Sequence, residues 1–221
     1  NEPSAACLVK VSDTAGPAAD SSNAVFTIAE QRTITVTVPN GSEDWLGTFD
    51  QTITWNSTGN IPNVKIEYST DNGSSWNTIA ASTANTGSYV WNVPNTPFTT
   101  CLMRVSDTAG PATDTGDAAF TIVEYRNITV TSPNGGEMWT RRSTQPITWT
   151  TIGSIGDVRI QYSLNGGTDW ILITDRTAND GNHLWTLPNV SQIKNNCLVR
   201  ILECDGSETD TGDNTFTITK W

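Results

Sequence analysis

The feature that most constrains the fold is an internal repeat with a spacing of 94 residues. The segment ITVTVPNGSEDW, residues 34–45, returns as ITVTSPNGGEMW, residues 128–139. Four tryptophans recur at this spacing, namely Trp45, Trp55, Trp76 and Trp91, followed by Trp139, Trp149, Trp170 and Trp185. Self-similarity at a fixed spacing is typical of an array of equivalent units. We therefore expect two complete units, over about residues 31–125 and 126–221.

Residues 1–30 correspond to only part of a further unit. The segment 1–32 aligns without a gap onto residues 95–126, so that Cys7 stands where Cys101 stands. It contains counterparts of only the last two strands of a unit, and an isolated hairpin is marginal in water. Two explanations stay open: the chain is a piece of a longer array, or another segment supplies the partner strands.

Apolar and polar residues alternate within each unit, as they do in half-buried strands. Val64, Ile66 and Tyr68 face one way, whereas Lys65 and Glu67 face the other. Strands are expected in the first complete unit at about 33–38, 51–56, 63–69, 75–80, 88–93, 100–106 and 118–124. Seven short strands in about 95 residues predict an all-β chain of tandem Ig-like or fibronectin-III-like β-sandwiches.

The charge balance excludes some partners. The chain carries 12 basic and 23 acidic residues, a formal net charge of −11. Nucleic acids and anionic membrane surfaces bind basic patches, so neither is an expected partner. No apolar run approaches the length that spans a bilayer, so membrane insertion is not expected either.

The segment STDNGSSW, residues 69–76, resembles the Asp-box of sialidase-type propellers and other carbohydrate-active proteins. A propeller would repeat such a hairpin about every 40–50 residues. Here the second copy, SLNGGTDW at residues 163–170, comes 94 residues later and replaces Asp71 by Asn165. Because both Asp and Asn can bond the backbone of a turn, the pattern predicts a structural corner and not a catalytic carboxylate.

Acidic residues gather around the loop between the last two strands of each unit. The candidate calcium ligands are Asp107, Asp114, Asp117, Asp205, Asp210 and Asp213. Carboxylate oxygens on a loop can hold calcium, but the spacing lacks the order of a recognised calcium loop. The alternative is that these residues cap turns and keep the surface soluble. No other cofactor is expected, since His183 is the single histidine and aligns with an aromatic residue, Tyr89.

Some tryptophans and one cysteine are further candidates for a site. Four tryptophans follow turns and have no clear facing, which makes them candidates for a sugar-stacking platform: Trp45, Trp76, Trp139 and Trp170. The alternative is that they pack in the core or against the turns. Cys204 has no counterpart in the other units, and we expect either an exposed free thiol or an intermolecular cross-link.

The repeated motifs P-N-G-G-E-x-W and S-x-D-N-G-x-x-W, with the strand sequences around them, resemble the Ser-Thr-rich, GPI-anchored (cell-wall synthesis type) Ig-like domain family. The likeness spans both complete units and the partial one. Similar units recur in tandem in secreted and surface proteins of bacteria. The resemblance implies an extracellular, non-catalytic sandwich that serves as a spacer or surface element, and it transfers no catalytic residue.

We therefore expect a structural repeat of an extracellular stalk, adhesin or filament at the cell surface, and not an enzyme. The incomplete first unit suggests a polymerising subunit that a neighbour completes, so other copies of the chain or neighbouring repeats are the expected partners. The alternative is a carbohydrate-binding accessory module of a larger secreted enzyme, with surface glycans as ligands. It requires exposed tryptophans such as Trp45 or Trp76.

Overall fold

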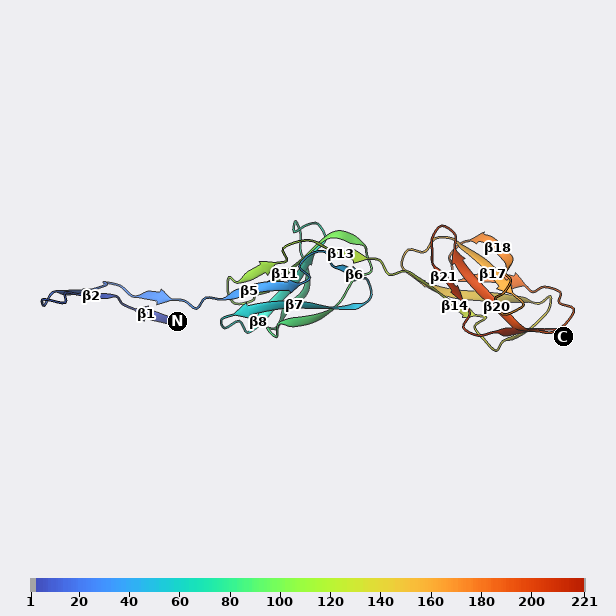
Figure 1. Cartoon of the computed structure of the whole chain (residues 1–221), viewed down its shortest axis with the longest axis horizontal. Coiled ribbons are helices and arrows are strands. Elements are labelled where there is room, and N and C mark those ends of the chain that lie inside the picture. Colours follow the sequence, from blue (N-terminus) through green and yellow to red (C-terminus); the bar gives the residue numbers. More distant parts are fainter. Residues whose placement is uncertain (1–2, 221) are drawn as a thin grey trace. The chain divides into compact units, whose positions relative to one another are not determined.

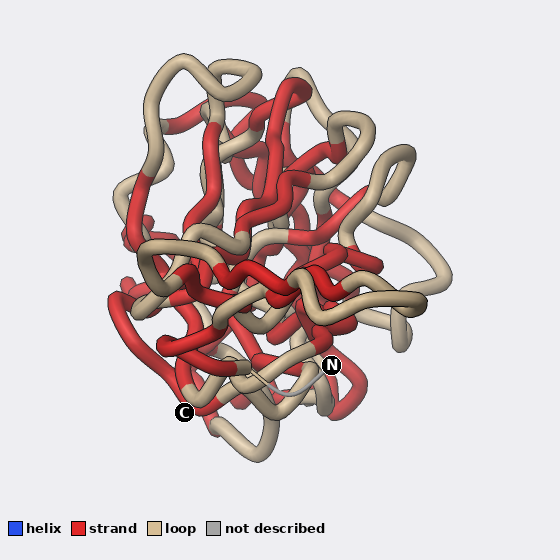
Figure 2. The backbone as a smooth tube through the Cα atoms, turned by 90° about the vertical axis from the view of Figure 1, so that its left-hand side faces the viewer, coloured by secondary structure: helices blue, strands red, loops and turns tan. Residues whose placement is uncertain are grey.

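The structure is a computed structural model that describes residues 3–220. The described chain consists of strands and loops (Figure 2), and none of its segments is a helix long and apolar enough to cross a membrane. It divides into two compact units, Asn1–Val123 and Glu124–Trp221. The predicted fold class, tandem all-β sandwiches, is confirmed.

In the first unit, two sheets face each other across one core (Figure 1). The smaller sheet has the order β10-β7-β5, with bounds Ser88–Asn92, Asp50–Thr58 and Thr33–Val38. The larger sheet has the order β6-β13-β11-β8-β9, with bounds Asp44–Leu46, Phe120–Val123, Phe98–Asp107, Asn63–Ser69 and Asn77–Ala84. A short strand, β12 (Thr113–Thr115), pairs with β11.

The second unit repeats this arrangement strand for strand. Its smaller sheet has the order β14-β16-β19, with bounds Asn127–Ser132, Thr144–Ile152 and Asn182–Thr186. Its larger sheet has the order β15-β22-β20-β17-β18, with bounds Met138–Thr140, Phe216–Thr219, Lys194–Glu203, Val158–Ser163 and Ile171–Thr177. The short strand β21 (Thr209–Thr211) pairs with β20.

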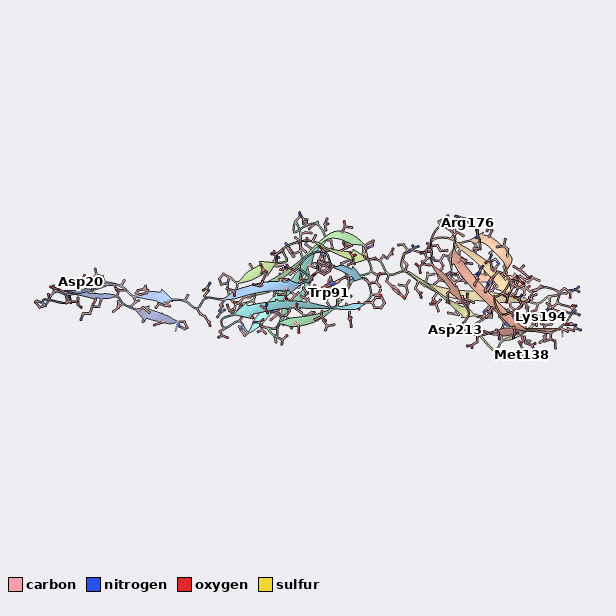
Figure 3. All side chains as sticks on the ribbon, in the orientation of Figure 1. Asp20, Trp91, Met138, Arg176, Lys194 and Asp213 are labelled. Carbon is pink, nitrogen blue, oxygen red and sulfur yellow. The ribbon has the colours of Figure 1, made fainter. Side chains whose placement is uncertain are left out.

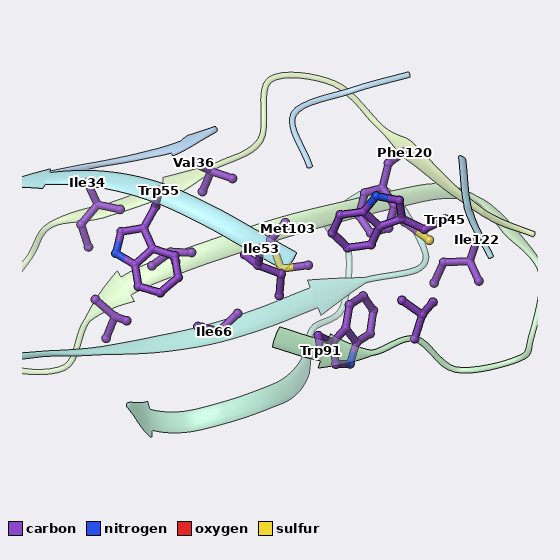
Figure 4. Close-up of a cluster of buried hydrophobic side chains, with 14 of the residues drawn as sticks. Ile34, Val36, Trp45, Ile53, Trp55, Ile66, Trp91, Met103, Phe120 and Ile122 are labelled. Carbon is purple, nitrogen blue, oxygen red and sulfur yellow. The ribbon is translucent and has the colours of Figure 1, made fainter. Parts of the chain in front are cut away.

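The core of each sandwich forms where the alternating apolar residues of the two sheets meet. In the first unit the ring centroid of Trp45 lies 5.1 Å from that of Phe120 and 6.1 Å from that of Trp91. Figure 4 shows these rings beside Ile53 and Met103, which are fully buried. Aromatic side chains therefore fill one end of this core, where they remove large apolar areas from water.

Residues 4–28 form a hairpin with its own two short sheets. β1 (Ser4–Cys7) pairs with β4 (Phe26–Ile28), and β2 (Lys10–Ser12) pairs with β3 (Ala19–Ser21). These are the counterparts of the last strands of a complete unit, as the alignment of residues 1–32 predicts. The structure shows no further strands in this hairpin's sheets.

Each unit has two strands that the sequence does not predict and a third strand that is displaced from its expected position. β6 and β12 have only three residues each, which is too short for a periodic pattern to appear in the sequence. The fourth long strand, expected at about 75–80, spans Asn77–Ala84, because the corner after β8 extends to Trp76. The other strands lie within a few residues of their expected positions.

Candidate functional site

The corner between β8 and β9 contains the Asp-box-like segment. Asp71 Oδ1 accepts hydrogen bonds from the Ser69 hydroxyl at 2.7 Å and from the Ser75 amide at 2.8 Å. Its Oδ2 accepts one from the Ser75 hydroxyl at 2.6 Å. These bonds, that of the Ser75 hydroxyl above all, lower the pKa of Asp71 to about 2, because they favour the charged carboxylate.

The second unit builds the same corner without a carboxylate at this position. Asn165 Oδ1 accepts from the Ser163 hydroxyl at 2.9 Å and from the Asp169 amide at 2.9 Å. One oxygen, common to Asp and Asn, thus makes the bonds that shape the turn in both units. The contacts agree with the structural role predicted for Asp71.

An arginine covers the tryptophan that ends each corner. The Arg104 guanidinium lies 3.9 Å from the centroid of the half-buried Trp76 ring and donates to Glu67 Oε2 at 2.8 and 3.1 Å. Burial raises the pKa of Glu67, but the hydrogen bonds from Lys65 and Arg104 outweigh it and hold the pKa below its usual value.

In the second unit Arg200 lies 4.2 Å from the centroid of Trp170 and donates to Gln161 Oε1 at 2.7 Å. Because a guanidinium occupies one face of each ring, that face is not open to a sugar. Trp45 is only 6% exposed. A buried ring cannot stack on a sugar, so the prediction that Trp45 belongs to a sugar platform was wrong. Trp139 is half-buried, with its ring centroid 5.2 Å from that of Phe216.

The aspartates predicted as calcium ligands tie each unit together through bonds to the protein. Asp114 Oδ2 accepts from the Val36 amide at 2.8 Å, and Asp210 Oδ2 accepts from the Val130 amide at 2.7 Å. Each carboxylate thereby links the short strand after the long β11 or β20 to the first strand of its unit.

The next pair of aspartates holds the Pro-Asn-Gly turn. Asn40 Nδ2 donates to Asp117 Oδ2 at 3.0 Å, and the Asp117 amide donates back to Asn40 Oδ1 at 2.7 Å. Asp213 and Asn134 exchange the same two bonds, at 2.9 and 2.6 Å.

The two remaining aspartates pair with arginines. Arg32 donates to Asp107 Oδ2 at 2.9 Å, and Arg176 donates to both oxygens of Asp205 at 3.0 and 2.8 Å. Figure 3 labels Arg176 and Asp213 in the second unit. Throughout residues 3–220 no three His, Cys, Asp or Glu side chains come together as a metal site requires. The structure thus does not assemble the predicted calcium ligands, because amide and guanidinium donors of the protein bind these oxygens.

The cysteines are unpaired in the described chain. Cys101 and Cys197 are fully buried, and burial raises the pKa of each thiol to about 11, so little reactive thiolate forms near neutral pH. Cys204 is half-buried, and its Sγ donates to the Asp175 carbonyl at 3.5 Å. A cross-link through Cys204 stays a prediction.

Two short parallel pairs join the beginning of each unit to its end. β6 pairs in parallel with β13, where the Thr121 amide donates to the Glu43 carbonyl at 2.8 Å and the Gly47 amide donates to the Val123 carbonyl at 2.8 Å. β15 and β22 pair in the same way in the second unit. Since the paired strands are parallel, the start of β6 and the end of β13 lie at opposite ends of the pair, and so do those of β15 and β22.

A glutamate and an arginine before each first strand bind the unit that follows. Arg32 binds Asp107, and Arg126 binds Glu203, whose side chain is 6% exposed. The Asn60 amide donates to Glu30 Oε1 at 3.0 Å, and Ser154 donates to Glu124 Oε1 through its amide and hydroxyl, both at 2.8 Å. Sequence reasoning missed these contacts, although the E-x-R spacing at residues 30–32 and 124–126 is visible in the repeat.

No family model matches the chain, and no curated protein matches its sequence. Solved structures that are similar include the fibronectin(III)-like modules of Clostridium thermocellum CbhA, at 13% identity over 85% of this chain and 95% of that one, with a TM-score of 0.33. Titin domains I67–I69 are 10% identical over 86% and 66% of the two chains, with a TM-score of 0.30. Drosophila N-cadherin EC1-4 is 10% identical over 96% and 57%, also with a TM-score of 0.30. At this identity and these scores, none of these likenesses carries an argument about function.

Proposed function

We propose that the chain is a non-catalytic structural repeat of an extracellular stalk, adhesin or filament, and that each complete unit transmits tension along the chain. The observation that carries the proposal is the parallel pairing of β6 with β13 and of β15 with β22. These pairs join the second strand of each unit to its last strand.

The direction of pairing decides how a unit responds to tension. When the two ends of a unit are pulled apart, the parallel strands β6 and β13, or β15 and β22, slide along each other, so the bonds between them are loaded together. Strands that are peeled apart from one end lose their bonds one after another and separate at lower force. A unit with this topology is therefore suited to resist tension.

The contacts that precede each unit support the same function. Arg32 and Arg126 anchor the connecting segment to a buried carboxylate of the unit that follows. The net charge of −11 favours solubility of an exposed array. The raised pKa of the buried thiols Cys101 and Cys197 keeps them unreactive toward disulfide exchange, which suits an extracellular location.

Single-molecule force spectroscopy on Thr121→Pro tests the proposal. Proline removes the amide that donates to Glu43 without removing a residue from the core. We expect two unfolding events in the chain, of which one moves to lower force while the other, from the unaltered second unit, keeps its force. Thr217→Pro, the equivalent change in the second unit, should weaken the other event. Unchanged forces in both variants would contradict the proposal.

The repetition of equivalent units favours a second proposal, that copies of the chain assemble into a polymer. Electron microscopy at high protein concentration tests whether the chain alone forms polymers. Dispersed monomers would show that copies of the chain do not assemble, and would leave the tension-bearing role of the complete units untouched.

A further inference from the structure

A pocket of about 360 Å³ lies at the side of the first unit where β9 and β10 are the last strands of their sheets. No hydrogen-bonded pairing joins β9 to β10 in the described chain, so the residues between these strands stay partly open to solvent. The volume falls within the range of pockets that take small ligands. The lining residues that decide its chemistry are Tyr68, Thr78, Ile79, Tyr89, Trp91 and Asn92.

Aromatic rings form much of the pocket wall. Alternation along β10 turns Tyr89 and Trp91 to the same side of the strand, toward the core. Tyr68, near the end of β8, lies with its ring centroid 4.8 Å from that of Trp91, at an interplanar angle of 45°. Tyr68 and Tyr89 are half-buried, and Trp91 is 8% exposed. The pocket therefore offers a packed aromatic surface that the core holds in place.

The indole N–H of Trp91 has no acceptor within residues 3–220, whereas that of Trp55 donates to Asn85 Oδ1 at 2.7 Å. Figure 4 shows the Trp91 nitrogen on the edge of its ring that points away from Trp45. This nitrogen is not sealed from solvent, because in the described chain only Glu203 Oε2 is a buried side-chain polar atom without a partner. A donor of a largely buried side chain is thus available to a molecule in the pocket.

Other lining groups also have hydrogen-bonding capacity left. The hydroxyls of Tyr68, Tyr89 and Thr78 make no hydrogen bond within residues 3–220. Asn92 Nδ2 donates to the Thr48 carbonyl and to an aspartate, both at 3.0 Å, which leaves its Oδ1 as an acceptor. None of the residues that line the pocket is charged. The pocket therefore combines aromatic faces with neutral donors and acceptors.

We infer that this pocket binds a neutral sugar ring of an oligosaccharide. A pyranose has a face of C–H groups, which packs on the negative face of an aromatic ring. Its hydroxyls and ring oxygen would pair with the Trp91 N–H, the tyrosine and Thr78 hydroxyls and Asn92 Oδ1. The inference goes beyond the proposed function, because none of these residues belongs to the parallel strand pairs that bear tension.

Two other occupants fit the pocket less well. A cation is attracted to the faces of aromatic rings, but the Trp91 N–H presents a positive hydrogen to the pocket and would repel it. An apolar segment of a protein would cover that N–H and the free hydroxyls without pairing them, at the cost of their lost hydration. A ligand with several hydroxyls avoids both penalties.

The second unit keeps the aromatic core but not the polar lining. Leu172 stands in the place of Thr78, and His183 in the place of Tyr89. Thr186 replaces Asn92, and its hydroxyl is already hydrogen-bonded to that of Thr144 at 3.1 Å. We therefore expect one sugar site in the described chain, in the first unit, and the second unit serves as an internal control.

Heteronuclear NMR on the isotope-labelled full chain tests the inference with three neutral probes: cellopentaose, maltopentaose and mannopentaose. At least one of them, added up to about 10 mM to reach a millimolar Kd, should shift the Trp91 indole signal and the Tyr89 amide signal saturably. The signals of Trp185 and His183, the second unit's equivalents, should stay in place.

The variant that combines Thr78→Leu with Tyr89→His copies the second unit, so it should fold with little loss of stability. It should weaken sugar binding at least about tenfold, because it removes two hydroxyls and a stacking ring. The matched control combines Leu172→Ala with His183→Ala in the second unit and should leave the affinity unchanged. The melting temperature of each variant shows that the first unit is folded.

The absence of a shift at Trp91 with all three sugars would overturn the inference. So would an unchanged affinity in the folded Thr78→Leu, Tyr89→His variant. If tetramethylammonium or an apolar peptide shifted the Trp91 signal and none of the sugars did, the occupant would belong to another chemical class, and the inference would again be wrong.

Discussion

Asp71 and Asn165 occupy the same corner of the two units, and their Oδ1 oxygens make the same bonds. We expect Asp71→Ala to lower the melting temperature of the first unit by a few degrees, because the Ser75 amide and the Ser69 hydroxyl lose their acceptor. Asp71→Asn, which copies the second unit, should retain most of the stability. Thermal denaturation followed by near-UV circular dichroism measures both, and equal losses in the two variants would contradict the structural role.

The charge of Asp71 adds a dependence on pH. Hydrogen bonds from Ser75 and Ser69 lower the pKa of Asp71 in the folded state to about 2, below its ordinary value of 3.8. The contribution of the charged form is therefore complete above about pH 4 and is lost as the pH falls toward 2. Between pH 5 and pH 2.5, the melting temperature of the wild type should fall more steeply than that of Asp71→Asn. Parallel pH curves for the two proteins would show that the charge contributes nothing.

The residue types at the corner correctly indicated a turn, whereas the residue types of the acidic cluster did not indicate which groups the carboxylates bind. The replacement of Asp71 by Asn165 was enough to indicate a turn, because both residues form the same local bonds. The acidic residues from Asp107 to Asp213 suggested calcium, but their partners are the amide of Val36 and side chains such as Arg32, about 75 positions away in the sequence. Composition cannot reveal contacts that only the folded topology creates.

The carboxylates predicted as calcium ligands hold strands and turns together through hydrogen bonds to the protein. Asp114, Asp117, Asp210 and Asp213 each accept a hydrogen bond from the protein. We expect an excess of EDTA, or added calcium, to leave both melting temperatures unchanged. A calorimetric scan checks this expectation. A rise of either transition with added calcium would show that the carboxylates bind the ion after all.

The stability of the second unit should depend on Arg126, which precedes β14 and binds Glu203. Arg126→Ala leaves the Glu203 carboxylate, 6% exposed, without its cation, and should destabilise the second unit by about 1–3 kcal/mol. Arg159→Ala is the control, since Arg159 and Asp175 form an exposed pair at 2.8 Å that should contribute less than about 1 kcal/mol. Urea denaturation gives both values. Similar losses for the two variants would show that burial of Glu203 has no special effect.

The sequence predicted the strands in which apolar and polar residues alternate over several positions, and it missed the strands of only three residues. β5 and β8, at Thr33–Val38 and Asn63–Ser69, coincide with the expected 33–38 and 63–69. β6 has three residues and pairs in parallel with β13, more than 70 positions away, so no local pattern reports it. The same strand explains the burial of Trp45, whose facing could not be predicted from the turn before it.

At the scale of the whole molecule, each complete unit should resist tension because its second strand and its last strand pair in parallel. Force spectroscopy in two pulling directions tests it on the second unit. Handles at the two ends of the chain load β15 and β22 in shear. Handles at positions 142 and 220, both beyond the same end of this pair, would peel the strands apart. Both arrangements use a background with Cys7→Ser and Cys204→Ser, because these two thiols are half-buried and the other two are buried, so that the handles attach only at the chosen positions.

Pulling from the ends should give two unfolding events, each releasing roughly 300 Å of chain, as about 95 residues extend. The second unit should unfold at a several-fold lower force when it is pulled through positions 142 and 220. Equal forces in the two directions would contradict the claim that the parallel strand pair makes this protein a tension-bearing repeat.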